Sequence, residues 1–480
     1  MNKRGKKLMI DVVMFALSNF GSKVLVFLMV PLYTHVLTTE EFAIADLMTG
    51  TINILFPVLT LAISEATLRF LLEENSDKGK ILGASLLFIG ISTMVIAIAT
   101  PFAKYINEEI AAYWGYFLAL YLATSLNSCM SNYVRGIDKT KLFATKGVLQ
   151  TLLLVSLNLL LLLGFEMGLR GYLFAIILSD VIVLLYMMIG CRIWTVLSNI
   201  RLDKNVVQQM LKYSVPMMPT IIAWWIMQIS DKYILIAYCG LAISGIYSVS
   251  YRIPSVLSIV SSIFNQAWQI SAVKAQSDED YSQYVIKVYQ YFFMISLGLC
   301  SLLIGASKLI GKFMFLGDFN IAWTYVPVLL VAYFYSGISG VMASIFTTKK
   351  RTAALMYSTL CAAVTNIVLN FLLIPQFGAM AAATTTAIAF LMTFLIRSYC
   401  TKKFFCIKLN GSREKIMSLL IIVQAIVMST DIVWKHLVNA VSISIIILSY
   451  SKEIFAFIKQ IKDMVKNKIS NKKQKENHPL

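Results

Sequence analysis

Charged residues are scarce in this chain, and the usual signatures of catalysis are missing from it. Only 14% of the 480 residues are charged, whereas 58% are hydrophobic; a soluble domain carries about 25% charged residues. The absence of a GxxxxGK[ST] loop argues against direct ATP hydrolysis. The sequence also has no clustered Ser/His/Asp pattern and no HExxH pattern. We therefore expect a protein that is not an enzyme and whose function resides in its apolar helices.

Metal-binding and disulfide patterns are also missing from the sequence. The three histidines do not cluster, and no CxxC pair exists. The seven cysteines lie mostly within or beside apolar stretches, so we interpret them as free thiols in the core. We expect neither a metal site nor a cofactor.

Long apolar runs dominate the sequence. They recur along almost the whole chain, and each has the roughly 18–25 residues needed to cross a hydrocarbon core of about 30 Å. We predict an all-α polytopic membrane protein with about 14 transmembrane helices. The predicted spans are 9–36, 42–70, 80–103, 111–134, 146–165, 170–190, 214–238, 242–272, 283–306, 322–346, 354–374, 379–400, 415–433 and 435–451.

Positive charge follows this predicted topology. The formal net charge is +18, which in a soluble protein would suggest a nucleic-acid partner. When the loops are sorted by side, most Lys and Arg residues fall on the side of the N-terminus. The other side has only Lys104, Arg170, Lys308, Lys312 and Lys435. Because cytoplasmic loops are enriched in Lys and Arg, we predict that both termini are cytoplasmic and that the protein binds no nucleic acid.

The segment 452–480 forms a lysine-rich tail. Its apolar residues recur at helical spacing: Phe455, Ile458, Ile461, Val465 and Ile469. This pattern suits an amphipathic helix on the anionic lipids of a membrane surface. A solvated basic tail that only fixes the topology explains the pattern equally well.

Two stretches of the chain resemble each other. EEFAIADLMTG (Glu40–Gly50) opens one predicted span, ISGIYSVSYRI (Ile243–Ile253) opens another, and Pro57 and Pro254 interrupt these spans. We predict two six-helix halves, 1–190 and 214–400, joined by a cytoplasmic linker at 191–213 and followed by an extra helix pair at 401–451. Two such pseudo-symmetric halves can enclose a cavity and rock to give alternating access. Generic similarity among apolar helices is the other explanation.

Basic residues inside predicted spans need a reason, because each costs about 2.5–3.5 kcal/mol on insertion. Lys23 and Arg252 lie deep in their spans and have no acidic residue three or four positions away, so the charged group does not easily reach the surface. We expect these two, with Arg69 and Lys232, to face a cavity and bind an anionic group. The alternative is a structural ion pair with another helix.

The acidic residues in the spans fall into different classes. Glu65 and Arg69 stand four apart in SEATLRF, a spacing that favours an ion pair on one helix face; otherwise Glu65 is a coupling or gating residue. Asp46 lies near a predicted helix end, where solvation or capping explains it. Asp180 lies deeper and is either a paired structural carboxylate or a coupling carboxylate.

Asp231 and Lys232 are adjacent, so their side chains diverge on a helix and do not pair well with each other. At least one of them should find its partner on another helix or on a ligand. Asp231 joins Glu65 and Asp180 as a candidate for coupling transport to H+ or Na+.

Three stretches resemble the Wzx-type polysaccharide flippases, members of the MOP superfamily together with the MATE drug exporters and the lipid II flippases. SDKYILIAYCGLAISGIYSVSYRIPSVLSIVSSIFNQAWQ (Ser230–Gln269) is similar to their seventh and eighth helices. NIVLNFLLIPQFGAMAAATTTAIAF (Asn366–Phe390) is similar to their eleventh and twelfth helices, and SEATLRF (Ser64–Phe70) to the end of their second.

This resemblance implies a function. A member of the family moves an undecaprenyl-pyrophosphate-linked oligosaccharide across the bacterial cytoplasmic membrane for capsule, O-antigen or exopolysaccharide synthesis, alongside membrane lipids and a polysaccharide polymerase as partners. Three other functions are compatible with the sequence: a MATE-like cation-coupled exporter of drugs or metabolites, a lipid II flippase, and a membrane enzyme such as a glycan polymerase. The last would need a larger outer loop than this chain offers.

Overall fold

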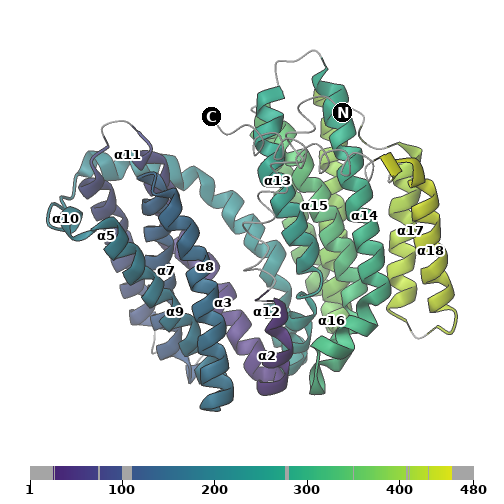
Figure 1. Cartoon of the computed structure of the whole chain (residues 1–480), viewed down its shortest axis with the longest axis horizontal. Coiled ribbons are helices and arrows are strands. Elements are labelled where there is room, and N and C mark those ends of the chain that lie inside the picture. Colours follow the sequence, from purple (N-terminus) through teal and green to yellow (C-terminus); the bar gives the residue numbers. More distant parts are fainter. Residues whose placement is uncertain are drawn as a thin grey trace, which may run out of the picture.

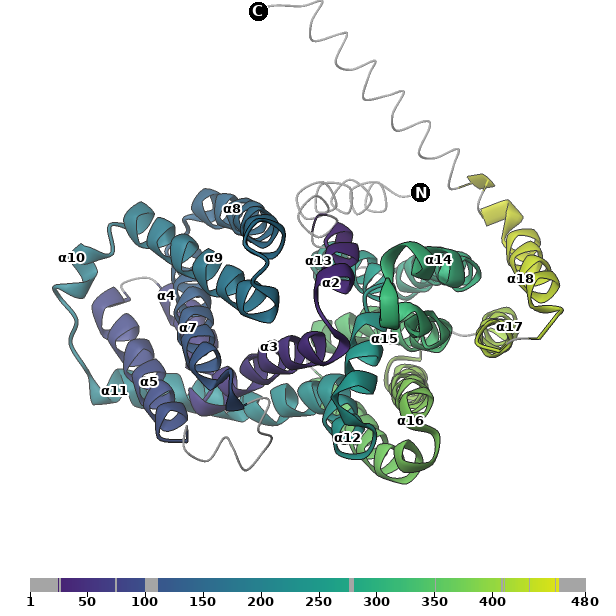
Figure 2. The ribbon, with the colours of Figure 1, turned by 90° about the horizontal axis from the view of Figure 1, so that it is seen from below.

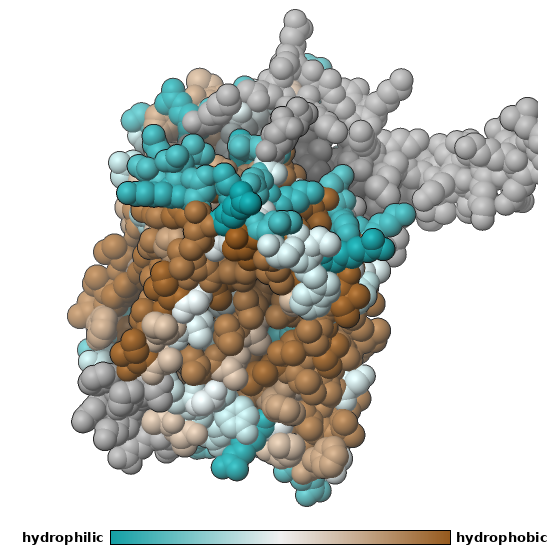
Figure 3. Space-filling model, turned by 90° about the vertical axis from the view of Figure 1, so that its left-hand side faces the viewer, coloured by the Kyte–Doolittle hydropathy of each residue, from teal (hydrophilic) through white to brown (hydrophobic). Residues whose placement is uncertain are grey.

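Helices make up nearly all of the part of the chain that the computed structural model describes. That part comprises residues 25, 27–73, 76–99, 111–275, 280–349, 351–406, 409, 411–430, 432–453 and 455–456, and it contains no strand. Eight of its helices are long and apolar enough to cross a membrane. Figure 3 shows a broad apolar band below a hydrophilic cap. The fold is that of a multi-pass membrane protein, as the apolar runs predict.

The helices fall into two groups in chain order. The first comprises α2 (Val30–Val36), α3 (Thr39–Leu59), α4 (Ile63–Leu71), α5 (Lys78–Ala99), α7 (Trp114–Gly136), α8 (Thr140–Asn158), η2 (Leu159–Gly164) and α9 (Gly168–Cys191). A linker with α10 (Trp194–Leu197), α11 (Lys204–Ser214) and η3 (Val215–Met217) follows. The second comprises α12 (Met218–Ser250), α13 (Ser255–Ala275), α14 (Tyr281–Met314), η4 (Gly317–Thr324), α15 (Val326–Thr348), α16 (Thr352–Phe405), α17 (Ser412–Met428) and α18 (Lys435–Ser449).

The two groups lie side by side and are joined at one end. In Figure 1, α5, α7, α8 and α9 stand on the left and α13–α16 on the right, and the ribbons diverge toward the end that carries α10 and α11. We call this end the linker end. At the opposite end α3 and α12 pack together between the two groups (Figure 2). We refer to α3–α9 as the N-terminal group and to α12–α16 as the C-terminal group.

Helix breaks occur at the positions where the sequence places proline and glycine. Pro57 lies near the end of α3, and the backbone turns there through Leu61 and Ala62, both with positive φ, before α4 begins. Pro254 lies in the gap between α12 and α13. Both prolines interrupt a predicted span, as expected.

Glycine marks the kinks in two of the long helices, each of which overlaps two predicted spans. Gly240 (φ +85°) kinks α12 and Gly378 (φ +58°) kinks α16, and each lies between two predicted spans. A residue with a side chain is strained at such φ values. Every predicted span from the second onward overlaps a described helix, whereas most of the first lies outside the described residues. The count of fourteen therefore stays a prediction.

Local hydrogen bonds fix where two of the helices begin. Thr38 and Glu41 form a capping box at the start of α3, in which the Thr38 hydroxyl accepts from the Glu41 amide and the Glu41 carboxylate accepts from the Thr38 amide. Asp203 caps α11 and pairs with Lys80 at 2.8 Å between Oδ2 and Nζ. The hydrogen bond from Lys80 holds the pKa of Asp203 below its ordinary value. These contacts tie the linker to α5.

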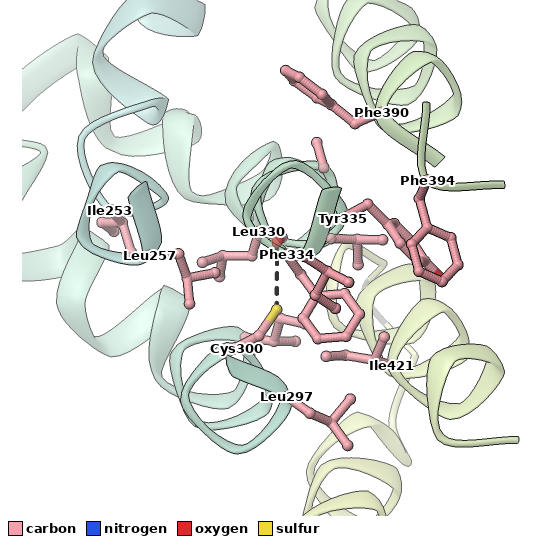
Figure 4. Close-up of a cluster of buried hydrophobic side chains, with 14 of the residues drawn as sticks. Ile253, Leu257, Leu297, Cys300, Leu330, Phe334, Tyr335, Phe390, Phe394 and Ile421 are labelled. Carbon is pink, nitrogen blue, oxygen red and sulfur yellow. Dashed lines mark hydrogen bonds between the residues drawn. The ribbon is translucent and has the colours of Figure 1, made fainter. Parts of the chain in front are cut away.

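Aromatic and aliphatic side chains fill the C-terminal group. Figure 4 shows Phe334, Tyr335 and Phe394 among the helices, with Ile421 reaching in from α17. Cys300 donates its thiol to the Leu330 carbonyl oxygen at 3.4 Å. The extra helix pair therefore packs on the C-terminal group through the same core. The predicted tail helix lies almost entirely outside the described residues.

Candidate functional site

The two groups of helices touch along α3 and α12, and glycine makes the contact close. A Cβ at Gly245 would overlap the carbonyl oxygen of Thr39, and one at Gly50 would lie 2.5 Å from Ile229 Cδ1. Trp225 donates from Nε1 to the Gly50 carbonyl oxygen at 3.3 Å. Small residues allow backbones in a membrane to approach this closely.

An ion cluster bridges the same contact. Lys232 on α12 lies 2.5 Å from Asp46 on α3, measured from Nζ to Oδ2. Arg252, just after α12, lies 3.9 Å from the other oxygen of Asp46. The guanidinium of Arg252 is also 5.5 Å from the centre of the Phe42 ring, and its buried Nε has no hydrogen-bond partner among the described residues. One carboxylate of the N-terminal group thus holds two cations from the C-terminal side, and one of these retains an unused donor.

Asp231 is held in a separate network beside this cluster. Its Oδ2 accepts from the hydroxyls of Tyr247 and Tyr251, both at 2.7 Å, and from Thr386 at 3.3 Å. Its Oδ1 accepts from the backbone amide of Lys232 at 2.9 Å. Only 1% of Asp231 is exposed. Neutral donors therefore surround this carboxylate and supply the hydrogen bonds without which its burial would be costly.

A second chain of polar groups runs from Ser230, the neighbour of Asp231, onto α16. Asn366 accepts from Ser230 and from Asn370, both at 3.1 Å, and Asn370 in turn accepts from Thr385. All of them except Ser230 are buried. The two asparagines are four residues apart, so one face of α16 supplies both.

The prediction for Asp231 and Lys232 is confirmed, because the two side chains find different partners. The prediction for Asp46 is wrong: this residue is neither solvated nor a cap but pairs across the contact. The prediction was based on the short sequence distance between Asp46 and the helix end. It failed because the packing of α12 on α3 encloses that end of the helix.

The proposed pair of Glu65 and Arg69 is also corrected. Arg69 pairs instead with Glu73, at 3.0 Å, with both side chains about half exposed. Glu65 is an exposed residue of α4. The structure therefore brings Asp231, Lys232 and Arg252 together but leaves Glu65 and Arg69 out of this cluster. Lys23 lies outside the described residues.

Asp180 occupies a second polar site, inside the N-terminal group. Its Oδ1 accepts from the amide groups of Asn127 at 2.6 Å and Gln150 at 2.7 Å, and its Oδ2 from the Thr124 hydroxyl at 2.9 Å. Lys146 is near enough to act on it electrostatically. These residues line a pocket of about 470 Å³.

Arg397 was overlooked in the sequence. It is 4% exposed, and its acceptors within the described ranges are all neutral: Ser358 at 3.0 Å, the Ser339 carbonyl oxygen at 2.9 Å and Thr359 at 3.1 Å. The available signal was a basic residue within a predicted span, the criterion that selected Arg252. Asn366 and Asn370 were missed because amides carry no charge.

Replacing Arg397 with leucine should lower the melting temperature of the purified protein. Three buried acceptors lose their donor, and each unsatisfied group costs about 1–3 kcal/mol. Thermal unfolding in detergent measures the effect, and Arg170→Leu serves as the matched control because Arg170 is exposed. Equal melting temperatures for both variants and the unmodified protein would contradict a structural role for Arg397.

Metal-binding geometry is not found in the described part of the chain, which contains no group of three or more His, Cys, Asp or Glu residues able to hold an ion. The side chains at the α3–α12 contact offer ionic and hydrogen-bonding interactions. Two cations, one of which has a spare donor, form a site at which an anion can compete with Asp46.

Solved structures with this fold include transporters. An inward-facing multidrug resistance MATE family transporter of the MOP superfamily is 13% identical, with a TM-score of 0.68 and coverage of 83% of this chain and 96% of that one. The lipid II flippase MurJ in an inward closed conformation is 15% identical, with a TM-score of 0.67 and coverage of 92% and 100%. A MOP superfamily transporter from Pyrococcus furiosus Vc1 is 12% identical, with a TM-score of 0.55 and coverage of 88% and 97%.

Family membership follows from the sequence itself. None of the curated proteins compared with this chain matches it. Residues 8–269, which include α3, α12 and the whole ion cluster, match the family described as polysaccharide biosynthesis protein. The chain has the fold of the MATE transporters and of MurJ, and it belongs to the polysaccharide biosynthesis protein family.

Proposed function

We propose that this protein carries undecaprenyl-pyrophosphate-linked oligosaccharide repeat units across the bacterial cytoplasmic membrane for the synthesis of a surface polysaccharide. The observation that carries the proposal is the family match over residues 8–269, which includes both cations of the ion cluster. A charged, glycosylated headgroup cannot cross a hydrocarbon core unaided, because burying its polar groups without partners costs several kcal/mol each. A protein of this fold supplies those partners between its two groups of helices.

Lys232 and Arg252 are the proposed contacts for the pyrophosphate. Both belong to the C-terminal side, both reach the contact with α3, and Arg252 has a donor that no group of the described chain uses. Lys23 is a further proposed contact. Arg69 is not retained, because Glu73 already neutralises it at an exposed position.

Asp46 gives this binding site a mechanical consequence. The carboxylate and a pyrophosphate compete for the same two cations, so a bound headgroup weakens the ionic link between α3 and α12. A ligand shifts a conformational equilibrium when it binds one state better than the other. In this mechanism the headgroup favours the state in which the α3–α12 contact is open, and release restores the pair with Asp46.

Orientation and coupling complete the proposal. The linker end, where the predicted cytoplasmic loops lie, faces the cytoplasm, and both termini are on that side. A gradient of H+ or Na+ drives the cycle through a carboxylate. Asp231 is favoured over Glu65 and Asp180, because it is the most deeply buried and adjoins the ion cluster. A polysaccharide polymerase would use the product on the outer side.

Deleting the gene should cause lipid-linked repeat units to accumulate inside the cell and surface polysaccharide to disappear. Mass spectrometry of extracted lipids and staining of surface glycan measure the two effects. Complementation with the intact gene is the control. Normal surface glycan in the deletion strain would count decisively against the proposal.

Export of drugs or metabolites is the second candidate function, and the structural similarity to the MATE transporter favours it. Overproduction would then raise resistance to cationic drugs and leave surface glycan unchanged. The proposed flippase function predicts instead that drug resistance stays unchanged and that the amount of surface glycan changes.

A further inference from the structure

The pocket around Asp180 has the lining of a ligand site. It lies among α3, α7, α8 and α9, and its volume of about 470 Å³ is within the range of small-molecule sites. Amide and hydroxyl side chains provide much of its wall, including Asn53, Asn127, Ser128 and Gln150. Polar groups inside a membrane protein are costly unless they serve a partner or a function. A polar ligand in the pocket would form hydrogen bonds with these groups.

The carboxylate in the pocket orders its neighbours. Both oxygens of Asp180 already accept hydrogen bonds, from Thr124, Asn127 and Gln150. Asn127 donates an N–H to Asp180. Its Oδ1 has no partner in the described part of the chain, although the residue is only 4% exposed. The wall thus retains an unused acceptor, which matches the hydroxyl donors of a ligand.

Basic and aromatic groups also line the pocket. Arg135, exposed at the end of α7, lies over the Phe143 ring with 5.3 Å from Cζ to the ring centre. Lys146 lies on the same wall and acts on Asp180. The pocket lining thus contains two cations and one carboxylate, and this excess of positive charge disfavours a bound metal ion or a cationic drug, because both would be repelled. A neutral or acidic polyhydroxylated ligand fits this charge pattern.

One face of α3 connects the pocket with the ion cluster. Asp46, Thr49 and Asn53 are spaced three and four residues apart, so they share a face of the helix. Asp46 holds the two cations, whereas Thr49 and Asn53 line the pocket. Seven residues of helix rise about 10 Å. A single ligand with a diphosphate at one end and sugars at the other can span this distance.

We infer that the Asp180 pocket is the subsite for the first sugars of the lipid-linked oligosaccharide. This inference rests on the proposed function and extends it: the diphosphate lies at Lys232 and Arg252, and the sugars reach along α3 into the N-terminal group. Each group of helices then holds a different part of one substrate. Asp180 acts as a positioning residue that orients the amides, and the amides recognise hydroxyl groups.

The test is a binding comparison with two lipids in nanodiscs. One probe is the lipid-linked oligosaccharide extracted from cells that lack the gene, and the other is undecaprenyl diphosphate, which carries no sugar. The variant is Asn53→Leu with Ser128→Leu, because both residues line the pocket and neither contributes to the Asp180 network. Asn205→Leu, at an exposed position of α11, is the matched control.

The pocket variant should bind the sugar-bearing lipid about tenfold more weakly, the loss expected for one or two hydrogen bonds. Its affinity for undecaprenyl diphosphate should equal that of the unmodified protein, and the control variant should match the unmodified protein for both lipids. An equal loss for both lipids, or no loss for either, would overturn the sugar subsite. If the unmodified protein binds neither lipid, the proposed function itself fails.

Discussion

Replacing Gly245 with leucine is expected to abolish export of the surface polysaccharide. Any side chain at this position meets the backbone carbonyl of Thr39, and a backbone atom cannot move aside as a flexible side chain can. Leucine favours helix over glycine by about 0.5–1 kcal/mol, so the loss would come from the clash. The variant cannot close the α3–α12 contact, and the cycle stops. Surface glycan per cell, normalised to membrane-inserted protein, measures the effect.

Gly298→Leu on α14 provides the matched control, because a Cβ there would meet nothing within 4 Å. This control should export normally and elute as a single species in gel filtration. Full export by the Gly245 variant would mean that the two groups of helices need not approach each other as closely as in this structure.

The second prediction concerns the ion pair between Lys232 and Asp46. Lys232→Ala leaves Arg252, at 3.9 Å, as the basic group paired with Asp46 among the described residues, and Asp46→Ala removes the acidic partner of both cations. Losing one member of a buried pair costs on the order of 3 kcal/mol. Both single variants should therefore melt at lower temperature, and Lys232→Ala should lose nearly all transport because it also removes a contact to the pyrophosphate.

A charge exchange separates the two roles of Lys232. The double variant Asp46→Lys with Lys232→Asp restores an ion pair, so its melting temperature should recover much of the loss. Transport should stay low, because the cation now lies on α3 and no longer acts together with Arg252. Lys312→Ala, at an exposed position of α14, is the control for loss of a lysine. Recovery of transport in the exchanged variant would show that Lys232 serves the contact alone.

The membrane fold was predictable because hydrocarbon imposes one requirement on every segment. Each spanning helix must be apolar and long, and its breaks need residues such as Pro57, Gly240 and Gly378. Pro57, which interrupts a predicted span in the sequence, lies two residues before the end of α3, and Gly240 and Gly378 are the kinks of α12 and α16. The division into halves at 1–190 and 214–400 remains a prediction. Within it, α2 shows how packing can cross such a boundary, because Thr34 donates to the Met314 carbonyl oxygen at 2.8 Å.

The site was predictable only in part, because charge alone does not reveal a partner. Arg252 and Lys232 were selected for their depth, and the structure places both at one carboxylate. That carboxylate belongs to Asp46, which we had interpreted as solvated or capping because it lies near a predicted helix end. The partner lies 186 residues away in the sequence, and spacing rules reach only three or four residues along one helix. The same limit explains the wrong pairing of Arg69, for which two acids lay at equal spacing.

Transport by the purified protein tests the central claim most directly. Lipid-linked oligosaccharide is incorporated into vesicles with and without the protein, and an enzyme added outside removes the accessible sugars. Without protein, about half of the glycan should be protected, because the headgroup does not cross unaided. With the protein and an imposed H+ or Na+ gradient, the protected fraction should fall toward zero, and Lys232→Ala should leave it at the level of empty vesicles. A protected fraction that stays the same with the unmodified protein under either gradient would contradict the account.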